Sequence, residues 1–258
     1  MFSGLILLLI LIAAGQLKIV SFKNFARIAL TGSLLALHWV FFYASIKYSN
    51  ISVGVVCFSL GSFFTALFDP LINRKKLSLP NLLLSGLILC GIGLIFGLDT
   101  TFRTGIILGV ISAILVALYT ISNERLTKSF DTQTITLYTM LGGWAGLTLI
   151  MPLYLYIFPV SRLTPSMADL GYLLLLASLC TVLLYLMVTE ALKKISAFTV
   201  NLTFNLEPLY SIVLAIIIYK ENKVLSFGFY AGLSLIILSV VLQMFRVSAQ
   251  HKKLSSVG

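Results

Sequence analysis

The sequence predicts an all-α membrane protein of about nine transmembrane helices, arranged as two inverted-topology repeats. Of its 258 residues, 59% are hydrophobic and only 10% are charged, and its mean hydropathy is +1.07. A soluble domain has roughly 45–50% apolar and about 25% charged residues. Apolar stretches close to the ~20 residues that a helix needs to cross a bilayer recur along the chain. Composition and periodicity therefore indicate an integral membrane protein.

Eight stretches have the length of a transmembrane helix, and short polar joints separate them. They are 28–48, 52–72, 80–98, 104–123, 133–158, 170–190, 198–219 and 225–246. Because lipid offers the backbone no hydrogen-bond partners, continuous apolar segments of this length form helices. A ninth stretch, 2–15, is short for a span, and no Lys or Arg precedes it as in a secretory signal. We interpret it as a helix whose beginning is absent.

Basic residues predict the orientation of the chain. There are 18 Lys and Arg residues, and the formal net charge is +10. If the 2–15 end lies outside and the chain crosses nine times, 13 of them fall on one side and 5 on the other. Because Lys and Arg gather in cytoplasmic loops, the C-terminus is predicted to be cytoplasmic, and the expected location is a bacterial inner membrane. Orientation accounts for the charge without nucleic acid, so the bilayer is the expected partner.

A long internal repeat emerges when the chain is shifted by 146 residues. Segment 58–89 then lies without gaps on 204–235, with Phe58 on Phe204 and Leu79 on Leu225. Five predicted helices separate the two copies, and an odd number of crossings inverts the second copy. Inverted repeats are typical of secondary transporters, whose binding site lies near the midplane. We divide the chain into a first repeat at 1–100, a second five-helix repeat at 101–246 and a cytoplasmic tail at 247–258. The first repeat has one helix fewer, which predicts a ten-helix transporter fold without its first helix.

The stretch 197–242 contains Pro208, Glu221 after Lys220, and Gly232, and with these residues it resembles the C-terminal helix pair of the EamA-type transporters in the drug/metabolite transporter superfamily. In that family a helix with a central Pro ends in a Gly-Glu step, and the next helix carries an early Gly. Segment 105–126 is similar to the first helix of a repeat, with Tyr119 where an aromatic residue is common. The first half departs from the pattern, because Ser62 stands in place of Pro, and Asp69-Pro70 is expected to supply a displaced break.

The resemblance implies a secondary transporter that exports small metabolites, such as amino acids or amphipathic compounds, by alternating access. Two alternatives of the same fold stay open: a remnant that no longer transports, and a membrane assembly subunit. An enzyme is not expected, because the sequence has no G-x-S-x-G or H-E-x-x-H motif and its two histidines are His38 and His251. No cofactor or metal is expected either.

Polar residues inside the predicted spans are the candidate binding residues. Glu207 lies close to the midpoint of 198–219, where a carboxylate costs about 2.5–3.5 kcal/mol or more unless it faces a cavity or a partner. Pro208 beside it removes a backbone hydrogen bond and is predicted to break the helix. An acid beside a freed carbonyl suits a cation, an amine or a proton relay. The alternative is a structural kink, with Glu207 held by Thr or Tyr of a neighbouring helix.

Two faces of the same helix compete for the cavity. Asn201 and Asn205 share one face, and Thr203, Glu207 and Tyr210 share the other; we favour the second. Histidine titrates near physiological pH, so mid-span His38 is a candidate for a coupling proton or a substrate contact, or else for a hydrogen bond to a neighbouring helix. The candidate substrate-binding residues are Glu207, Thr203, Tyr210, Asn201, Asn205, His38, Trp39, Tyr119 and Ser112, with Pro208 as the helix break.

Small residues within the spans predict tight helix packing. Glycines spaced by four residues let helices approach backbone to backbone, and four such pairs occur: Gly93/Gly97, Gly105/Gly109, Gly142/Gly146 and Gly228/Gly232. The three cysteines lie in apolar runs and are odd in number, so we interpret them as core residues rather than disulfides or metal ligands.

Overall fold

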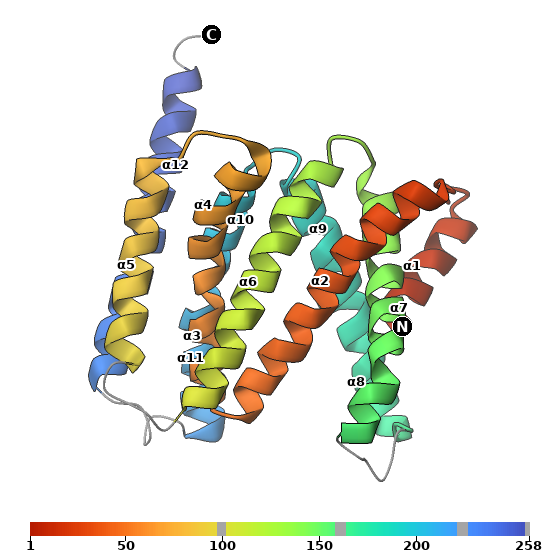
Figure 1. The fold of residues 1–258 in the computed structure, drawn as a ribbon, viewed down its shortest axis with the longest axis horizontal. Helices are drawn as coiled ribbons and strands as arrows, with labels where there is room; N and C mark the ends of the chain where they lie inside the picture. The colour runs from red at the N-terminus through yellow and green to blue at the C-terminus, as the bar shows by residue number, and fades with distance from the viewer. Residues whose placement is uncertain (97–101, 158–163, 221–226, 256–258) are drawn as a thin grey trace. The chain divides into compact units, whose positions relative to one another are not determined.

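All the regular secondary structure is helical in the residues that the computed structural model describes, which are 1–96, 102–157, 164–220 and 227–255 (Figure 1). Within these ranges, six helices are long and apolar enough to cross a membrane by length and composition. They are Phe22–Lys47, Ile51–Asn73, Arg103–Leu126, Thr132–Tyr156, Met167–Ala191 and Phe227–Arg246. Phe2–Ala13 and Leu79–Leu94 are shorter apolar helices. The predicted all-α membrane protein is confirmed, and the count of nine crossing helices stays a prediction.

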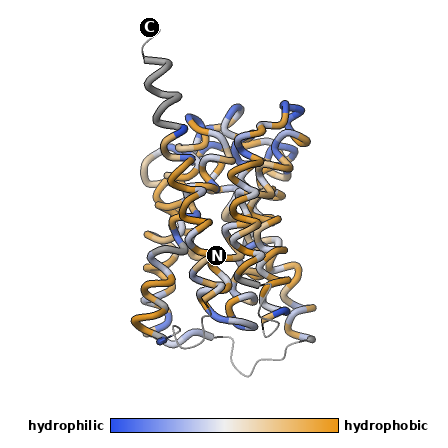
Figure 2. The backbone as a smooth tube through the Cα atoms, turned by 90° about the vertical axis from the view of Figure 1, so that its left-hand side faces the viewer, coloured by the Kyte–Doolittle hydropathy of each residue, from blue (hydrophilic) through white to orange (hydrophobic). Residues whose placement is uncertain are grey.

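The helices follow the predicted apolar stretches, and hydrophilic residues gather at their ends (Figure 2). In chain order they are α1 (Phe2–Ala13), α2 (Phe22–Lys47), α3 (Ile51–Phe58), α4 (Leu60–Asn73), α5 (Leu79–Phe96), α6 (Arg103–Leu126), α7 (Thr132–Ile157), α8 (Met167–Ala177), the π-helix η1 (Ser178–Leu183), α9 (Leu184–Ala191), α10 (Ala197–Phe204), α11 (Glu207–Tyr219) and α12 (Phe227–Ser255). Stretch 198–219 is divided at Asn205 and Leu206, and stretch 52–72 is interrupted at the single residue Ser59, whose backbone stays right-handed helical at φ −58° and ψ −22°. Both interruptions therefore fall inside segments whose hydropathy is continuous.

The chain forms two compact units. The first contains residues 1–37 and 122–196, and the second contains 38–121 and 197–258. Each unit draws on both halves of the sequence, and helices α2 and α6 contribute residues to both. The repeats predicted at 1–100 and 101–246 are a division of the sequence, and that division stays a prediction.

Glycines bring α2 and α7 into close contact in the first unit. A Cβ atom added at Gly142 would overlap the backbone and side chain of Ala29. One added at Gly146 would lie 2.7 Å from Ser33 Oγ, and Ser33 Oγ also reaches the carbonyl of Gly142 at 3.5 Å. A methyl group does not fit at these positions unless the helices move apart. The predicted close packing is therefore confirmed for the Gly142/Gly146 pair.

Other expectations about small residues are borne out only in part. In the second unit, Cβ atoms added at Gly105 and Gly109 would lie 2.6 and 2.5 Å from the Cβ atoms of Ser49 and Cys57. One added at Gly93 would meet nothing within 4 Å, so that prediction is wrong, and Gly97 lies outside the described residues. Of the cysteines, Cys57 is buried, whereas Cys90 and Cys180 are exposed. The core interpretation is thus wrong for those two, because their apolar helices turn them outward.

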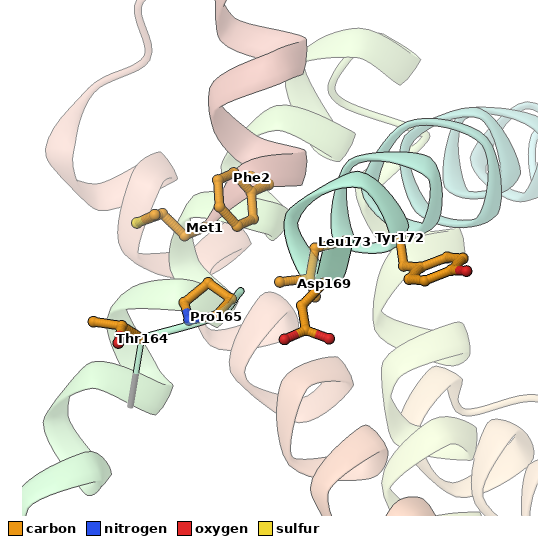
Figure 3. A pocket seen from close by; sticks show the side chains of 7 residues that line it. All are labelled: Met1, Phe2, Thr164, Pro165, Asp169, Tyr172 and Leu173. Atoms are coloured by element: carbon orange, nitrogen blue, oxygen red, sulfur yellow. The ribbon is translucent and has the colours of Figure 1, made fainter. Parts of the chain in front are cut away.

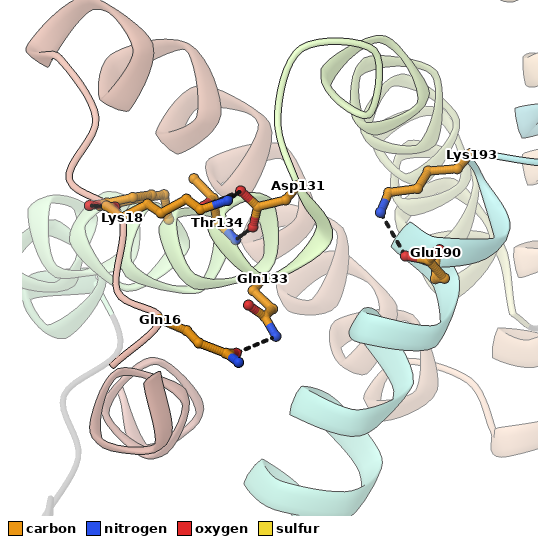
Figure 4. Close-up of polar contacts among 8 residues, drawn as sticks. Gln16, Lys18, Asp131, Gln133, Thr134, Glu190 and Lys193 are labelled. Carbon is orange, nitrogen blue, oxygen red and sulfur yellow. Dashed lines mark hydrogen bonds and ion pairs between the residues drawn. The ribbon is translucent and has the colours of Figure 1, made fainter. Parts of the chain in front are cut away.

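Polar side chains join the loops before α2 and α7 at one end of the first unit (Figure 4). Lys18 Nζ lies 2.9 Å from Asp131 Oδ2. Asp131 Oδ1 accepts a hydrogen bond of 3.0 Å from the backbone N–H of Thr134, and thereby caps the N-terminus of α7. Gln133 Nε2 donates to Gln16 Oε1 at 3.0 Å. Both loops belong to the side that the sequence predicts to be cytoplasmic.

The second unit contains two broken helices that pack side by side in antiparallel orientation. Helix α3 stops at Phe58 and α4 resumes at Leu60, while α10 stops at Phe204 and α11 begins at Glu207. Helix α4 packs on α10, and α3 packs on α11 (Figure 1). The first half of each broken helix therefore packs on the second half of the other, as in an antiparallel pair of helices. The paired helices α5 and α12 complete this group.

The ends of the two broken helices coincide when the chain is shifted by 146 residues. Phe58 corresponds to Phe204, and the last residues of α4 and α11 are Asn73 and Tyr219. The residues that follow, Arg74 and Lys220, are both left-handed, with φ of 51° and 56°. Glycine is favoured in that conformation, which gives a physical reason for the family's Gly at the position of Lys220. The register chosen from the sequence therefore matches the helix boundaries.

The first broken helix does not break where we expected. A displaced break was predicted at Asp69-Pro70, but α4 runs through Pro70 to Asn73. The interruption lies at Ser59 instead. Pro70 cannot donate to the carbonyl of Ala66, so α4 lacks one intrahelical hydrogen bond there and still continues for three residues.

We expect Gly142→Ala to destabilise the protein by about 1–3 kcal/mol, because the methyl group forces α2 and α7 apart. Gly171→Ala is the matched control, since a Cβ atom added there, in α8, meets nothing within 4 Å. Both changes add the same atom to a helix. Thermal unfolding in detergent should show a lower Tm for the first variant only; equal shifts would contradict close packing at Gly142.

Protonation of Asp131 should lower the stability of the folded protein in acid. Burial raises the pKa of Asp131, but hydrogen bonds from Thr134 and Lys18 outweigh it, so its pKa lies below the ordinary value. A lowered pKa contributes stability that is fully present above the unfolded-state pKa of about 4. This stability is lost as the pH falls through the folded-state pKa. Asp131→Ala should cost about 0.5–2 kcal/mol through the lost cap, and should flatten the acid limb of Tm against pH.

The variant Lys18→Ala removes the ion pair but keeps the Asp131 cap, so it separates their contributions to stability. Lys18 is largely exposed, and an exposed ion pair contributes no more than about 1 kcal/mol. Its loss should therefore lower Tm less than Asp131→Ala does. If the two variants lost stability equally, the cap of α7 would not be the main role of Asp131.

Candidate functional site

Two buried asparagines tie the break between α10 and α11 to neighbouring helices. Asn201 Nδ2 donates to Thr65 Oγ1 at 2.6 Å, and Thr120 Oγ1 donates to Asn201 Oδ1 at 3.1 Å. Asn205 Nδ2 donates to Ser62 Oγ at 3.1 Å. All five side chains are buried. Because unsatisfied polar groups are costly away from water, these hydrogen bonds hold α10 to α4 and α6 at a defined register.

The other face of the same segment is more open. Glu207 is the first residue of α11 and is half-buried; a carboxylate is favoured there by the positive end of the helix dipole. Thr203 is exposed, and its hydroxyl donates to the carbonyl of Thr199 at 2.8 Å. Tyr210 is 59% exposed. The structure thus separates the two candidate faces into a buried asparagine face and an accessible face around Glu207.

The helix is interrupted just before Pro208, which was predicted to mark the break. The interruption covers Asn205 and Leu206, whose backbone N–H groups bond to carbonyls three residues back, at 3.1 and 3.0 Å. Pro208 is the second residue of α11, in the first turn of a helix, where a missing N–H group costs nothing. Glu221, the acidic residue of the family pattern, lies outside the described residues.

His38 joins α2 to α6 in the second unit. Its Nδ1 atom lies 2.8 Å from Ser112 Oγ and 3.0 Å from the Ser112 carbonyl, and Ser112 Oγ donates back to the His38 carbonyl at 3.1 Å. The imidazole also contacts the rings of Phe42 and Phe58, with centroids 6.0 and 5.4 Å away. His38 therefore hydrogen-bonds a neighbouring helix, and both partners are buried.

The remaining candidates are aromatic. Tyr119 on α6 is buried. Trp39 on α2 is half-buried and meets the ring of Tyr43 edge-on, with centroids 6.5 Å apart. The substrate contact proposed for these two residues stays a prediction.

Sequence reasoning missed the partners on α4 and α6. Thr65, Ser62 and Thr120 are hydrogen-bond partners of the two asparagines, and Phe58 meets Phe204 with centroids 6.1 Å apart. A signal was available for part of this set. The shift of 146 residues that pairs Phe58 with Phe204 also brings the Ser59–Ser62 segment onto the segment that begins at Asn205.

A groove of about 730 Å³ lies elsewhere, in the first unit (Figure 3). Met1, Thr164, Asp169 and Tyr172 are among its lining residues, and none of the candidate site residues is. Asp169 Oδ2 accepts hydrogen bonds from the backbone and hydroxyl of Ser166 at 2.9 and 2.7 Å, so its carboxylate already caps α8. Within the described ranges, no group of three His, Cys, Asp or Glu residues is placed to hold a metal ion.

Comparison with known proteins agrees with the fold and the motifs. The model of the EamA-like transporter family matches residues 1–97 and 103–245. An uncharacterized transporter of Haemophilus influenzae is 28% identical over 205 residues, which cover 76% of this chain and 64% of that protein, less than two thirds of its length. A protein of known crystal structure matches with a TM-score of 0.63 at 15% identity, over 93% of this chain and 83% of that one, which is a likeness of fold. The chain therefore belongs to the EamA-like transporter family.

Proposed function

We propose that the protein is a secondary transporter that exports small metabolites, such as amino acids or amphipathic compounds, by alternating access. Family membership supports transport, and the pair of broken helices in the second unit is the observation that carries the proposal. Irregular backbone at membrane depth is tolerated only where protein or a water-filled cavity satisfies it. Broken helices of this kind form the substrate and ion sites of secondary transporters.

The face around Glu207 is proposed to contact the substrate. Asn201 and Asn205 already hydrogen-bond to α4 and α6, so their amides position the break. Glu207, Thr203 and Tyr210 remain at least partly accessible. A carboxylate at the start of a half-helix attracts an amine or carries a proton. Glu207 is accordingly the proposed charged contact, with Thr203 and Tyr210 beside it.

The proposed setting is a bacterial inner membrane with the C-terminus in the cytoplasm. The bacterial relative supports the membrane, and the distribution of basic residues supports the orientation. The proposed partners are the bilayer and a small-molecule substrate.

Glu207→Gln should reduce export by about tenfold or more, because a hydrogen bond to a charged group contributes about 1.5–3 kcal/mol and each 1.4 kcal/mol is tenfold. Export is measured in cells over-producing the protein, screened across amino acids and amphipathic amines, at several pH values. Expression should stay close to wild type, because a neutral amide of equal size replaces the acid.

Glu190→Gln is the matched control. Glu190 lies at the end of α9, exposed, where it pairs with Lys193 at 2.7 Å. The same chemical change there should leave export unchanged. Wild-type rates for Glu207→Gln across the pH range would remove Glu207 from the transport site. Absence of export by the wild-type protein for every compound class would favour the non-transporting alternatives instead.

A further inference from the structure

The two helix breaks occupy equivalent positions and lie next to each other. Ser59 at the first break and Asn205 at the second differ by the same 146 residues that relate the helix ends. Phe58 and Phe204, which precede them, have ring centroids 6.1 Å apart. Asn205 Nδ2 reaches Ser62 Oγ at 3.1 Å, and Ser62 Oγ donates to the Ser59 carbonyl at 3.0 Å. A hydrogen-bonded path therefore leads from one break to the other.

Both break residues carry a buried oxygen that the described residues leave without a hydrogen-bond partner. Ser59 is 0% exposed and Asn205 is 1% exposed, and the unpartnered atoms are Ser59 Oγ and Asn205 Oδ1. Other buried polar atoms of the second unit are also unpartnered, Ser85 Oγ among them, but these two belong to residues that are joined through Ser62, by its hydrogen bonds with the Asn205 amide and the Ser59 carbonyl. A buried polar oxygen is costly to leave unpaired, so a ligand that accepts electron pairs is favoured at this point.

The chemistry of the cluster selects a small monovalent cation. Its ligating atoms are neutral oxygens, which hard cations prefer, and no Lys, Arg or His occurs in 51–66 or 197–212. Helices α4 and α11 begin where α3 and α10 end, so the opposite ends of the helix dipoles offset each other and the oxygens carry the attraction. Glu207 is the acid nearest in sequence, whereas a divalent ion normally draws several carboxylates.

We propose that Ser59 and Asn205 bind a Na⁺-sized cation at the paired breaks, assisted by Ser62 and by carbonyls at the ends of α3 and α10. Binding itself does not depend on transport. Its use as the coupling ion rests on the proposed function.

The experiment is a titration of thermal stability with purified full-length protein in detergent. NaCl replaces N-methylglucamine chloride at constant ionic strength, and KCl replaces it in a parallel series. A ligand that binds only the folded state raises Tm with its concentration. We expect a saturable rise in Tm with Na⁺ that K⁺ does not produce at the same concentration.

Two variants locate the site, and one controls for the substitution. Ser59→Ala should raise the half-maximal Na⁺ concentration about tenfold, since a ligating oxygen is lost. Asn205→Asp keeps the oxygen and adds charge, so it should lower that concentration about tenfold. Ser85→Ala removes a buried unpartnered hydroxyl on α5 and should leave the Na⁺ response unchanged.

Three results would overturn the proposal. One is a wild-type Tm that responds equally to Na⁺, K⁺ and N-methylglucamine, which would leave the two oxygens to water. Another is an unchanged Na⁺ response in Ser59→Ala. If Ser59→Ala does not fold, a Na⁺ response of Asn205→Asp that equals wild type overturns it instead. This assay needs no substrate and no membrane. The Na⁺ response can therefore be absent while Glu207-dependent export persists, and export can be absent while the Na⁺ response persists.

Discussion

The membrane interior provides no hydrogen-bond partner for a polypeptide backbone, and the arrangement of the second unit follows from this constraint. An interrupted helix in lipid exposes polar groups that must find partners within the protein. Here two interrupted helices pack antiparallel with their interruptions next to each other, so each lies beside the polar groups of the other. Asn201 and Asn205 supply side-chain amides to hydroxyls of α4. This pairing therefore buries the polar groups of both interruptions in one cluster, and it leaves the Glu207 face accessible.

Both units combine close helix approach at glycines with clusters of apolar side chains. In the first unit, glycines let α2 and α7 approach at van der Waals distance, and polar pairs such as Lys18 with Asp131 join the loops at one end. In the second unit, an apolar cluster that includes Ile88, Leu202 and Ile236 surrounds the broken helices. Between helices in lipid, packing and interhelical hydrogen bonds drive association.

Hydropathy was sufficient to predict the helical class and the approximate span of each helix, because an apolar run of bilayer length has one stable conformation. The break before Glu207 was also predictable, since an acid and a proline stand together in an apolar run. The break at Ser59 was not, because serine is common in transmembrane helices and Asp69-Pro70 offered a more conspicuous candidate. Side-chain contacts of Asn201 with Thr65 and Thr120 depend on which helices meet, which a single sequence does not specify. The shift of 146 residues was the exception, since it related the two breaks before their contacts were known.

The opposed orientation of the two broken helices is the central claim, and the ends of α4 and α11 test it most directly. Single cysteines are introduced by Arg74→Cys and Lys220→Cys in a protein whose Cys57, Cys90 and Cys180 are replaced by serine. Intact cells are then treated with a membrane-impermeant maleimide, before and after permeabilisation. The account predicts that Lys220→Cys reacts in intact cells and that Arg74→Cys reacts only after permeabilisation. Reaction of both from the same side would contradict it.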